Sequence, residues 1–340
     1  MVRQRFWFMS QLLIPRTGPP AEVTELHPQD PPPPGPGEVL VRMLAASINP
    51  ADLNFIEGTY GSKPPLPCVP GMEGAGVIES LGEGVLAGFP RLREGAPVLP
   101  LLTPGNWAKW RVLPADRIFV LPDGIDPLQA ALLRVNPPTA CGLLHGPGAP
   151  EAGSWVVQNA ASSAAGHCVI QIAKLLGMHT LNFVRRPESI PLCAGLGADL
   201  VFMDDADGLA AAKAALTERR VPPPRLALNA VGGDSALRLM DLLGAGGTHI
   251  TYGAMARQPL RVPNGLLIFK ALTLRGFWLT LWKASVKPEG MDKLYHQLSQ
   301  WVVSGQLRQE IAATYPVENY REALTHAAQS SRNGKILLTF

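Results

Sequence analysis

One stretch of the chain decides the fold: residues 154–186 read SWVVQNAASSAAGHCVIQIAKLLGMHTLNFVRR. The apolar run at 154–159 predicts a strand, the spacing of apolar residues over 165–176 predicts an amphipathic helix, and 180–184 predict a second strand. Only small residues fill the turn before the helix, so the backbone there could approach a phosphate closely, facing the free N–H groups of the helix start. The stretch therefore predicts a dinucleotide-binding unit. The alternative is an ordinary turn of small residues that packs helix on strand.

The glycine pattern of this turn is weak, because the usual fingerprint has three glycines and only Gly166 is present. The end of the second strand carries more information. An acid at that place would accept hydrogen bonds from a ribose 2′-hydroxyl, whereas Arg185 and Arg186 can grip a 2′-phosphate. The arginines favour NADPH as the cofactor. Their alternative reading is a solvated turn.

The unit extends in both directions from this stretch. Before it, residues 128–145 can form a helix despite Pro137 and Pro138. Strands predicted at 226–231 and 248–252 alternate with helices, which indicates a parallel sheet covered by helices. The residues before 125 are rich in strands separated by turns, and those after 273 return to mixed character. We therefore predict an α/β fold in which a doubly wound parallel-sheet domain, residues 128–272, is inserted into a β-rich domain of residues 1–127 and 273–340.

Composition limits the function classes. The chain has 340 residues, 46% of them hydrophobic, and a formal net charge of only +3, which gives no support for a nucleic-acid partner. No apolar run is long enough to cross a membrane. Residues 1–15 lack the apolar core of a signal peptide and predict the first strand, so a cytoplasmic enzyme is the default expectation.

Neither a metal site nor a nucleophile elbow is evident in the sequence. The four cysteines have no Cys-x-x-Cys spacing and predict reduced thiols. Zinc-dependent alcohol oxidation would need Cys, His or carboxylate ligands. The Pro70–Gly74 turn carries Met72 where a ligand histidine would help, and the turn at Asn49–Asp52 has no cysteine. We predict an enzyme without a metal, and no Gly-x-Ser-x-Gly pattern supports acyl hydrolysis.

Several blocks of sequence together resemble the zinc-free medium-chain dehydrogenase/reductase superfamily, and within it the mitochondrial-type 2-enoyl thioester (enoyl-CoA and enoyl-ACP) reductases. The quinone reductase branch is the next most similar. The resemblance covers nearly the whole chain and implies a Rossmann-type cofactor domain inserted in a GroES-like catalytic domain. It also implies a homodimer formed through strands of the cofactor domain. The blocks are 46–54, 56–61, 135–140, 158–160, 226–233, 251–255, 266–270 and 275–279.

The resemblance implies roles for individual residues. Tyr60 matches a tyrosine proposed as proton donor, and Trp278 is the second candidate in the catalytic cleft; each could instead only shape the pocket. One departure concerns Ala164, where the family usually keeps a glycine, which predicts a slightly displaced phosphate turn. The residues matched to the cofactor site are Asn136, Ser162, Ser163, Ala164, Ala165, Arg185, Arg186, Tyr252, Gly253, Ala254, Met255, Phe277, Trp278, Leu279 and Lys335.

The implied reaction is conjugate reduction of an α,β-unsaturated thioester: hydride from NADPH adds to the β-carbon and a proton adds to the α-carbon. A phenol such as Tyr60 is neutral at pH 7 and can donate that proton. The first alternative is an NADPH-dependent quinone or enone reductase on the same fold. The second is an NADPH-binding protein without catalytic activity, against which Tyr60 and the matched cofactor residues argue.

Overall fold

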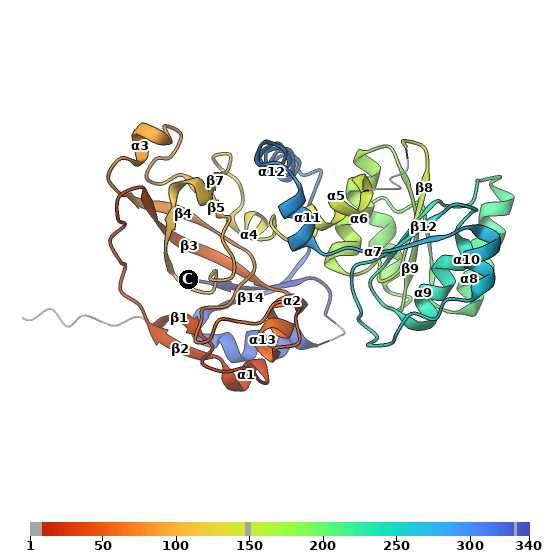
Figure 1. Cartoon of the computed structure of the whole chain (residues 1–340), viewed down its shortest axis with the longest axis horizontal. Coiled ribbons are helices and arrows are strands. Elements are labelled where there is room, and N and C mark those ends of the chain that lie inside the picture. Colours follow the sequence, from red (N-terminus) through yellow and green to blue (C-terminus); the bar gives the residue numbers. More distant parts are fainter. Residues whose placement is uncertain (1–8, 147–150, 330–331) are drawn as a thin grey trace, which may run out of the picture. The chain divides into compact units, whose positions relative to one another are not determined.

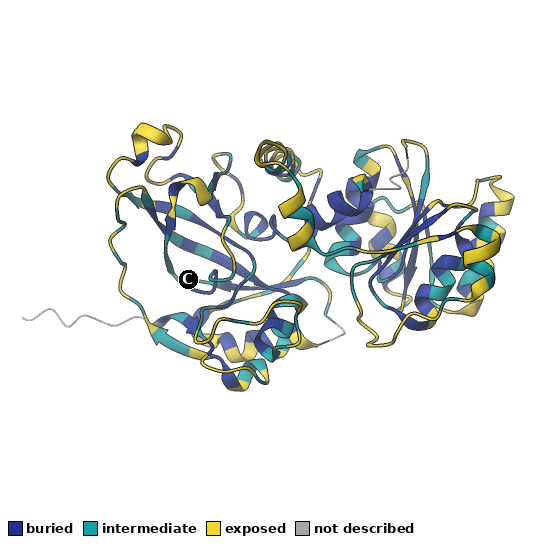
Figure 2. Ribbon diagram, viewed as in Figure 1, coloured by how far each residue is buried: buried dark blue, intermediate teal, exposed yellow. Residues whose placement is uncertain are grey.

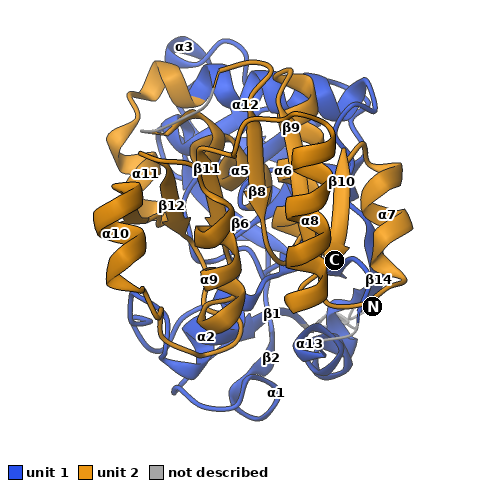
Figure 3. Cartoon of the chain, turned by 90° about the vertical axis from the view of Figure 1, so that its right-hand side faces the viewer, with its two compact units in different colours: residues 1–135, 292–340 blue, residues 136–291 orange. Residues whose placement is uncertain are grey.

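The computed structural model describes residues 9–146, 151–329 and 332–340, and the chain divides into two compact units (Figure 3). Unit 1 comprises Met1–Val135 and Asp292–Phe340, and unit 2 comprises Asn136–Met291. The second unit is thus an insertion in the first, as the sequence pattern indicated.

Unit 2 is built on a parallel sheet of six short strands (Figure 1) in the order β10-β9-β8-β11-β12-β13, and all of these strands except β13 are labelled in Figure 3. The strand order reverses at β8, because β9 and β10 extend the sheet on one side and β11 to β13 on the other. This is the doubly wound arrangement predicted from residues 154–186. The strands are β8 Trp155–Gln158, β9 His179–Val184, β10 Leu200–Met203, β11 Leu226–Asn229, β12 Thr248–Thr251 and β13 Thr273–Gly276.

Helices cover both faces of this sheet. On one face α8 and α9 pack on the strands, with Ala212 and Leu239 against Val157. On the other face α6 and α7 pack through Ile170 and Cys193 against Val184. Buried residues follow the strands, whereas exposed residues lie along α10 and α11 (Figure 2). The helices are α5 Asn136–His145, α6 Ala164–Leu175, α7 Ser189–Gly195, α8 Ala206–Glu218, α9 Gly233–Leu242, α10 Asn264–Lys270 and α11 Leu279–Ser285.

Unit 1 contains a seven-stranded sheet in the order β14-β15-β3-β4-β5-β7, with β6 beside β3, and a separate pair, β1-β2. All of its pairings are antiparallel except β14 with β15. Bulges in the pairing of β3 with β4 let this long strand bend around its core. The strands are β1 Met9–Leu13, β2 Glu25–Pro28, β3 Glu38–Ile48, β4 Gly74–Leu81, β5 Pro97–Pro100, β6 Trp110–Pro114, β7 Ile118–Val120, β14 Ile311–Pro316 and β15 Lys335–Thr339.

The helices of unit 1 are mostly short. Phe55 of α2 and Leu324 of α13 share one buried core with Ile336 of β15, so this core ties the two ends of the unit together. In the part of the chain that the structure describes, no helix is both long and apolar enough to cross a membrane. The helices are α1 Pro20–Val23, α2 Pro50–Glu57, α3 Val85–Gly88, α4 Pro127–Ala130, α12 Pro288–Val303, which begins in unit 2, and α13 Tyr320–Ala328, with single 3₁₀ turns at Ala115–Arg117 and Val317–Asn319.

The structure corrects two details of the sequence reading. Residues 128–145 were expected to form one helix but form α4 and α5, because Pro137 and Pro138 lack the N–H that a helix interior needs and fit only in a first turn. The boundary placed at 272/273 also differs. Strand β13 pairs in parallel with β12 and so belongs to the parallel sheet of unit 2. Unit 2 therefore extends from residue 136 to 291, whereas the sequence predicted 128 to 272.

Candidate active site

The predicted cofactor residues of unit 2 gather at one edge of its sheet. All six strands are parallel, so their carboxyl ends share that edge, and the crevice at the reversal of strand order lies between β8 and β11. The turn predicted to bind phosphate lies between β8 and α6, and Arg185 and Arg186 follow β9. The 252–255 loop follows β12, and Phe277 follows β13. Segments up to about a hundred residues apart in sequence are therefore placed together by the topology.

The phosphate turn is held tightly against the helix that follows it. Ser163 is the N-cap of α6, and its Oγ accepts a hydrogen bond from the Gly166 N–H at 3.1 Å. A Cβ on Gly166 would lie 2.6 Å from the Ala161 carbonyl oxygen and 2.7 Å from that of Ala160. The single glycine of the fingerprint is thus needed for this close packing. Ala164 is the first residue of α6, an ordinary helical position where an alanine fits without strain.

The first-turn N–H groups of α6 point along the helix axis toward the turn. Intrahelical acceptors do not exist for the first four N–H groups of a helix, and the Ser163 hydroxyl satisfies only that of Gly166. The N–H groups of Ala164 and Ala165 can therefore bind an anion, and the helix dipole favours negative charge there. This geometry fits a pyrophosphate.

A chain of buried polar side chains links the strand ends behind the turn. Asn159, directly before the turn, donates to Asn229 Oδ1 and Ser235 Oγ, both at 2.8 Å, and accepts from the Ala230 N–H. Ser235 in turn donates to Asp204, which follows β10. These hydrogen bonds fix the spacing of three strand ends. None of the four side chains was among the predicted site residues. The signal for three of them, Asn159, Asp204 and Asn229, was a polar residue at or just after the end of a mostly apolar strand, whereas Ser235 lies in α9 and had no such signal.

The two arginines differ in their surroundings. Arg185 is exposed, whereas Arg186 is partly buried, with its Nε 3.5 Å from Glu188 Oε1. Both directly follow Val184, the last residue of β9. Arg185 therefore has the freedom to reach an anionic group at this edge, and Arg186 has a carboxylate partner beside it.

The remaining predicted residues of unit 2 pack around α5 and β11. The backbone N–H groups of Tyr252 and Met255 donate to the carbonyls of Asn229 and Ala230 at 2.9 Å, so the 252–255 loop lies against the end of β11, and Gly253 and Ala254 complete it. The Tyr252 hydroxyl is buried near Cys168, and burial raises the pKa of this phenol.

The aromatic segment after β13 contacts the helix that begins at Asn136. The Phe277 ring lies over Gly142 of α5, where a Cβ would come within 2.7 Å of the ring, and 6.0 Å from the Trp282 ring. Trp278 caps α11, and Leu279 is its first residue. Asn136, at the start of α5, is buried. The structure thus brings Asn136 and the 277–279 segment onto neighbouring elements, α5 and α11.

Tyr60 lies in unit 1, just beyond α2. The backbone N–H groups of Thr59 and Tyr60 both donate to the Asn54 carbonyl, at 2.9 and 3.1 Å, so the loop is fastened to the last turn of the helix. The partly buried Tyr60 ring packs against the core of buried residues that includes Phe55 and Trp107.

Lys335 is also in unit 1, buried in a network of polar side chains. Its ammonium donates to Asn49 Oδ1 and lies 3.8 Å from Glu73 Oε1. Glu73 is fully buried and also accepts from Ser47 Oγ at 2.6 Å and from the N–H groups of Arg134 and Val135. The structure therefore places Lys335 as the counter-ion of a buried carboxylate, and its predicted role at the cofactor stays a prediction.

Asp52 extends this network to α2. Its carboxylate accepts from the Asn49 N–H at 2.8 Å and from the Met72 N–H at 2.7 Å, which joins the start of α2 to the Pro70–Gly74 turn. Burial raises the pKa of Asp52 to about 7, against the lowering effect of those two hydrogen bonds.

The donor set between these two turns does not suit zinc. Asn49 and Met72 offer no thiolate or imidazole, and the Lys335 ammonium beside Asn49 would repel a metal cation. Across the described ranges, no group of three or more His, Cys, Asp and Glu side chains has the arrangement of a metal site.

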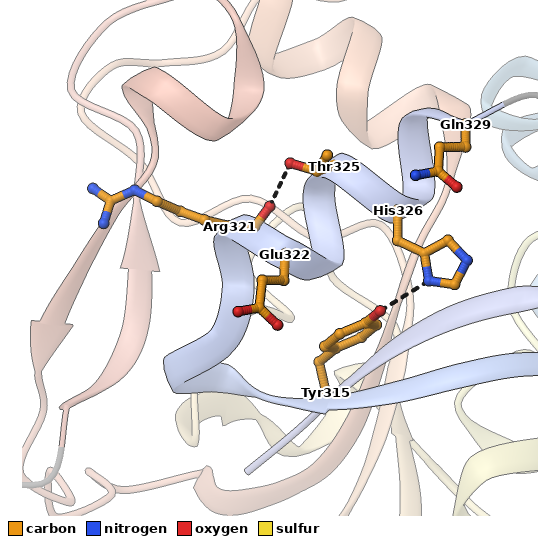
Figure 4. Close-up of a pocket in the computed structure, with 6 residues that line it drawn as sticks. All are labelled: Tyr315, Arg321, Glu322, Thr325, His326 and Gln329. Atoms are coloured by element: carbon orange, nitrogen blue, oxygen red, sulfur yellow. Dashed lines mark hydrogen bonds between the residues drawn. The ribbon is translucent and has the colours of Figure 1, made fainter.

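A surface pocket of about 510 Å³ lies on α13 of unit 1 (Figure 4). In its lining the Tyr315 hydroxyl and His326 Nδ1 form a hydrogen bond of 2.9 Å, and Arg321 points away from that pair. A second hollow, of about 550 Å³, lies between Leu209 of α8, Asp234 of α9 and Leu266 of α10. Neither pocket is lined by a predicted site residue.

Two family models match the chain. The alcohol dehydrogenase GroES-like domain matches residues 35–123, in unit 1, and the zinc-binding dehydrogenase family matches residues 164–294, which include most of the cofactor-type sheet.

Eight relatives that match 86–95% of the chain share one description, mitochondrial enoyl-acyl-carrier-protein reductase. The protein of Mus musculus is 39% identical over 307 residues, 89% of this chain and 81% of the relative. That of Homo sapiens is 38% identical over 95% of this chain and 86% of the relative, and that of Arabidopsis thaliana is 35% identical over 95% and 83%. These relatives contradict the expectation of a cytoplasmic enzyme, since each is described as mitochondrial.

Solved structures agree in fold over nearly the full length. The complex of Etr1p with NADP and crotonyl-CoA has a TM-score of 0.85 at 28% identity and covers 97% of this chain and 99% of that one. A Bacillus thuringiensis protein assigned as an NADPH:quinone reductase has a TM-score of 0.87 at 26% identity, with coverage of 97% and 98%. Fold similarity is thus as high for the quinone reductase as for the thioester reductase.

Proposed function

Because this chain belongs to the medium-chain dehydrogenase/reductase superfamily, and within it to the enoyl-acyl-carrier-protein reductases, we propose that it reduces the C=C bond of 2-enoyl thioesters with NADPH. The observation that carries the proposal is an identity of 35–39% to these reductases over 89–95% of the chain. The substrate class follows from their description and from the crotonyl-CoA held by Etr1p.

The sheet edge of unit 2 supports NADPH as the cofactor. The N–H groups of Ala164 and Ala165 would hold the pyrophosphate, and Arg185 with Arg186 would hold the 2′-phosphate by charge-assisted hydrogen bonds. The 252–255 loop and the 277–279 segment, which lie at the same edge, would enclose the rest of the dinucleotide. When bound, NADPH supplies the hydride that adds to the β-carbon.

The chain itself must supply a proton for the α-carbon and hydrogen bonds to the thioester oxygen, which becomes negative in the transition state. We assign the proton to the Tyr60 hydroxyl, since a phenol is protonated at neutral pH. Trp278 would bound the acyl cleft as a large flat surface. The competing assignment is that Tyr60 only shapes the wall of the pocket and donates no proton.

A direct assay separates the thioester reductase from the alternative quinone reductase, which the likeness to the Bacillus thuringiensis structure keeps in view. NADPH oxidation is measured with crotonyl-CoA and with a simple quinone under the same conditions. We expect kcat/KM to be at least tenfold higher with crotonyl-CoA. Absence of turnover with every enoyl thioester would reject the proposal, and turnover with the quinone alone would establish the alternative.

We further propose that the protein forms a homodimer through unit 2. Strand β13 is an edge strand of the sheet, with Thr273, Arg275 and Gly276 exposed. Next to it in the chain, α10 exposes Ile268 and Phe269 at 69% and 84%. An open strand edge with large apolar side chains beside it is a surface that a second copy can cover.

A further inference from the structure

We propose that the buried polar network of Ser47, Asn49, Asp52, Glu73 and Lys335 positions Tyr60 for proton transfer. These five are positioning residues, because none of them needs to touch the substrate. The inference rests on the proposed function only for the role of Tyr60, and it assigns the network a part in the reaction beyond filling the core.

The first step of the argument is that α2 acts as the arm that carries Tyr60. Helix α2 spans Pro50–Glu57, roughly 12 Å at the usual rise per residue. Asp52 fixes its start through the Asn49 N–H, and the carbonyl of Asn54 fixes Thr59 and Tyr60 at its end. A tilt at the start of α2 is therefore transmitted almost fully to Tyr60.

The second step is that the helix start has no freedom of its own. The Asn49 side-chain amide donates to Ser47 Oγ at 2.9 Å and to Glu73 Oε1 at 3.0 Å and accepts from Lys335. The second carboxylate oxygen of Asp52 is held by the Met72 N–H at 2.7 Å. Three separate segments, β3, the 70–74 turn and β15, thus determine where α2 begins.

The third step concerns charge. Asp52 and Glu73 are both fully buried, and Lys335, with 3% exposure, is the cation within the network. Carboxylates buried in this way keep their geometry only while every acceptor is satisfied. The network is therefore stiff, which suits a proton donor whose displacement by about 1 Å can cost roughly a hundredfold in rate.

Asp52→Asn is the variant that loosens the arm with least disturbance. It keeps the size of the side chain but turns one acceptor into an NH₂ donor that faces a backbone N–H. Glu57→Gln is the matched control, because Glu57 is a carboxylate on the same helix outside the network. We expect Asp52→Asn to lower kcat with crotonyl-CoA at least tenfold and to leave KM for NADPH within twofold, and Glu57→Gln to change neither.

A double-mutant cycle with Tyr60→Phe distinguishes positioning from general stability. If the network acts through Tyr60, Asp52→Asn changes kcat by less than twofold in the Tyr60→Phe background. An equal loss of kcat in both backgrounds would overturn the inference. If Tyr60→Phe alone leaves kcat intact, the assigned role of Tyr60 fails, and the inference fails with it.

Hydrogen exchange gives a readout that does not depend on the reaction. We expect faster amide exchange at residues 58–60 in Asp52→Asn, with unit 2 unchanged. Unchanged exchange at those residues would refute the positioning role even if the enzyme reduces thioesters. Should Asp52→Asn not fold, Ser47→Ala replaces it in both experiments; this substitution removes the hydrogen bond from Ser47 Oγ to Glu73 and the one that Ser47 Oγ accepts from Asn49.

Discussion

At the scale of single residues, we expect the choice between NADPH and NADH to depend on Arg185. It is exposed just after β9, and the ion pair that the described residues show here joins its neighbour Arg186 to Glu188, at 3.5 Å. We predict that Arg185→Ala raises the Kd for NADPH roughly tenfold or more, the loss typical of a hydrogen bond to a charged group, and leaves the Kd for NADH unchanged.

Fluorescence titration with both nucleotides measures this effect. Arg219→Ala is the control, because Arg219 is an exposed arginine at the far end of α8. Equal weakening of NADPH and NADH would show that Arg185 does not read the 2′-phosphate.

His249 is a second residue whose surroundings set a measurable property. It lies on β12 with no exposed surface, neither ring nitrogen has a hydrogen-bond partner among the described residues, and burial lowers its pKa to about 4. In the unfolded chain a histidine takes up a proton below about pH 6.5. Stability from this group is therefore complete above pH 6.5 and is lost as the pH falls from 6.5 to 4.

The resulting prediction concerns the free energy of unfolding. Between pH 7 and pH 5 the wild-type chain should lose about 2 kcal/mol more than His249→Leu, from the shift of the pKa of His249. Urea unfolding at the two pH values measures the difference. His27→Gln is the control, because His27 is a histidine of unit 1 whose side chain is 39% exposed. Parallel losses in wild type and His249→Leu would mean that another group sets the acid sensitivity.

At the scale of elements, the close packing between the turn after β8 and the start of α6 requires that residue 166 has no side chain. Gly166→Ala would place a Cβ 2.6 Å from a backbone oxygen, and backbone cannot move aside as a side chain can. We predict a loss of about 1–3 kcal/mol in stability, the usual cost of overpacking, and at least tenfold weaker NADPH binding as the turn shifts.

Gly195→Ala is the matched control for this substitution. Gly195 ends α7 in the same unit and has nothing within 4 Å of an added Cβ. Thermal unfolding and NADPH titration should show no loss for it. If Gly166→Ala binds NADPH as tightly as wild type, the phosphate turn does not depend on this contact.

Individual helices and strands also show how much of the fold could be predicted from the sequence. The β8–α6–β9 unit was predictable, because its apolar periodicity and small-residue turn are local. The division of residues 128–145 into α4 and α5 was missed although Pro137 and Pro138 mark it locally. The network of Asn49, Glu73 and Lys335 was not predictable, since it joins residues up to 286 positions apart, and no local pattern records such a pairing.

At the scale of the whole molecule, the same contrast explains the domain boundary. Residues 273–276 have the composition of a strand in either unit, and only pairing with β12 assigns them to the inserted sheet. Parallel pairing depends on partners distant in sequence, so composition alone could not choose. The assignment has a consequence, because it makes β13 the edge of that sheet and gives unit 2 an open side.

That open side carries the last prediction, which concerns assembly. Strand β13 is the last strand of the described sheet, so one of its sides has no neighbouring strand. Phe269 on α10 is a large apolar side chain that is 84% exposed, and its contact with water is unfavourable. Two copies related by a two-fold axis could pair their β13 edges and cover both Phe269 rings.

We predict that wild-type protein is a dimer in solution and that Phe269→Glu is a monomer, because the substitution would place two carboxylates in an apolar interface. Light scattering after size-exclusion chromatography measures the mass of each, and Leu192→Glu is the control, since Leu192 is exposed on α7 beside the other half of the sheet. A dimer that persists in Phe269→Glu would place the interface elsewhere, and a monomeric wild type would leave β13 a true edge.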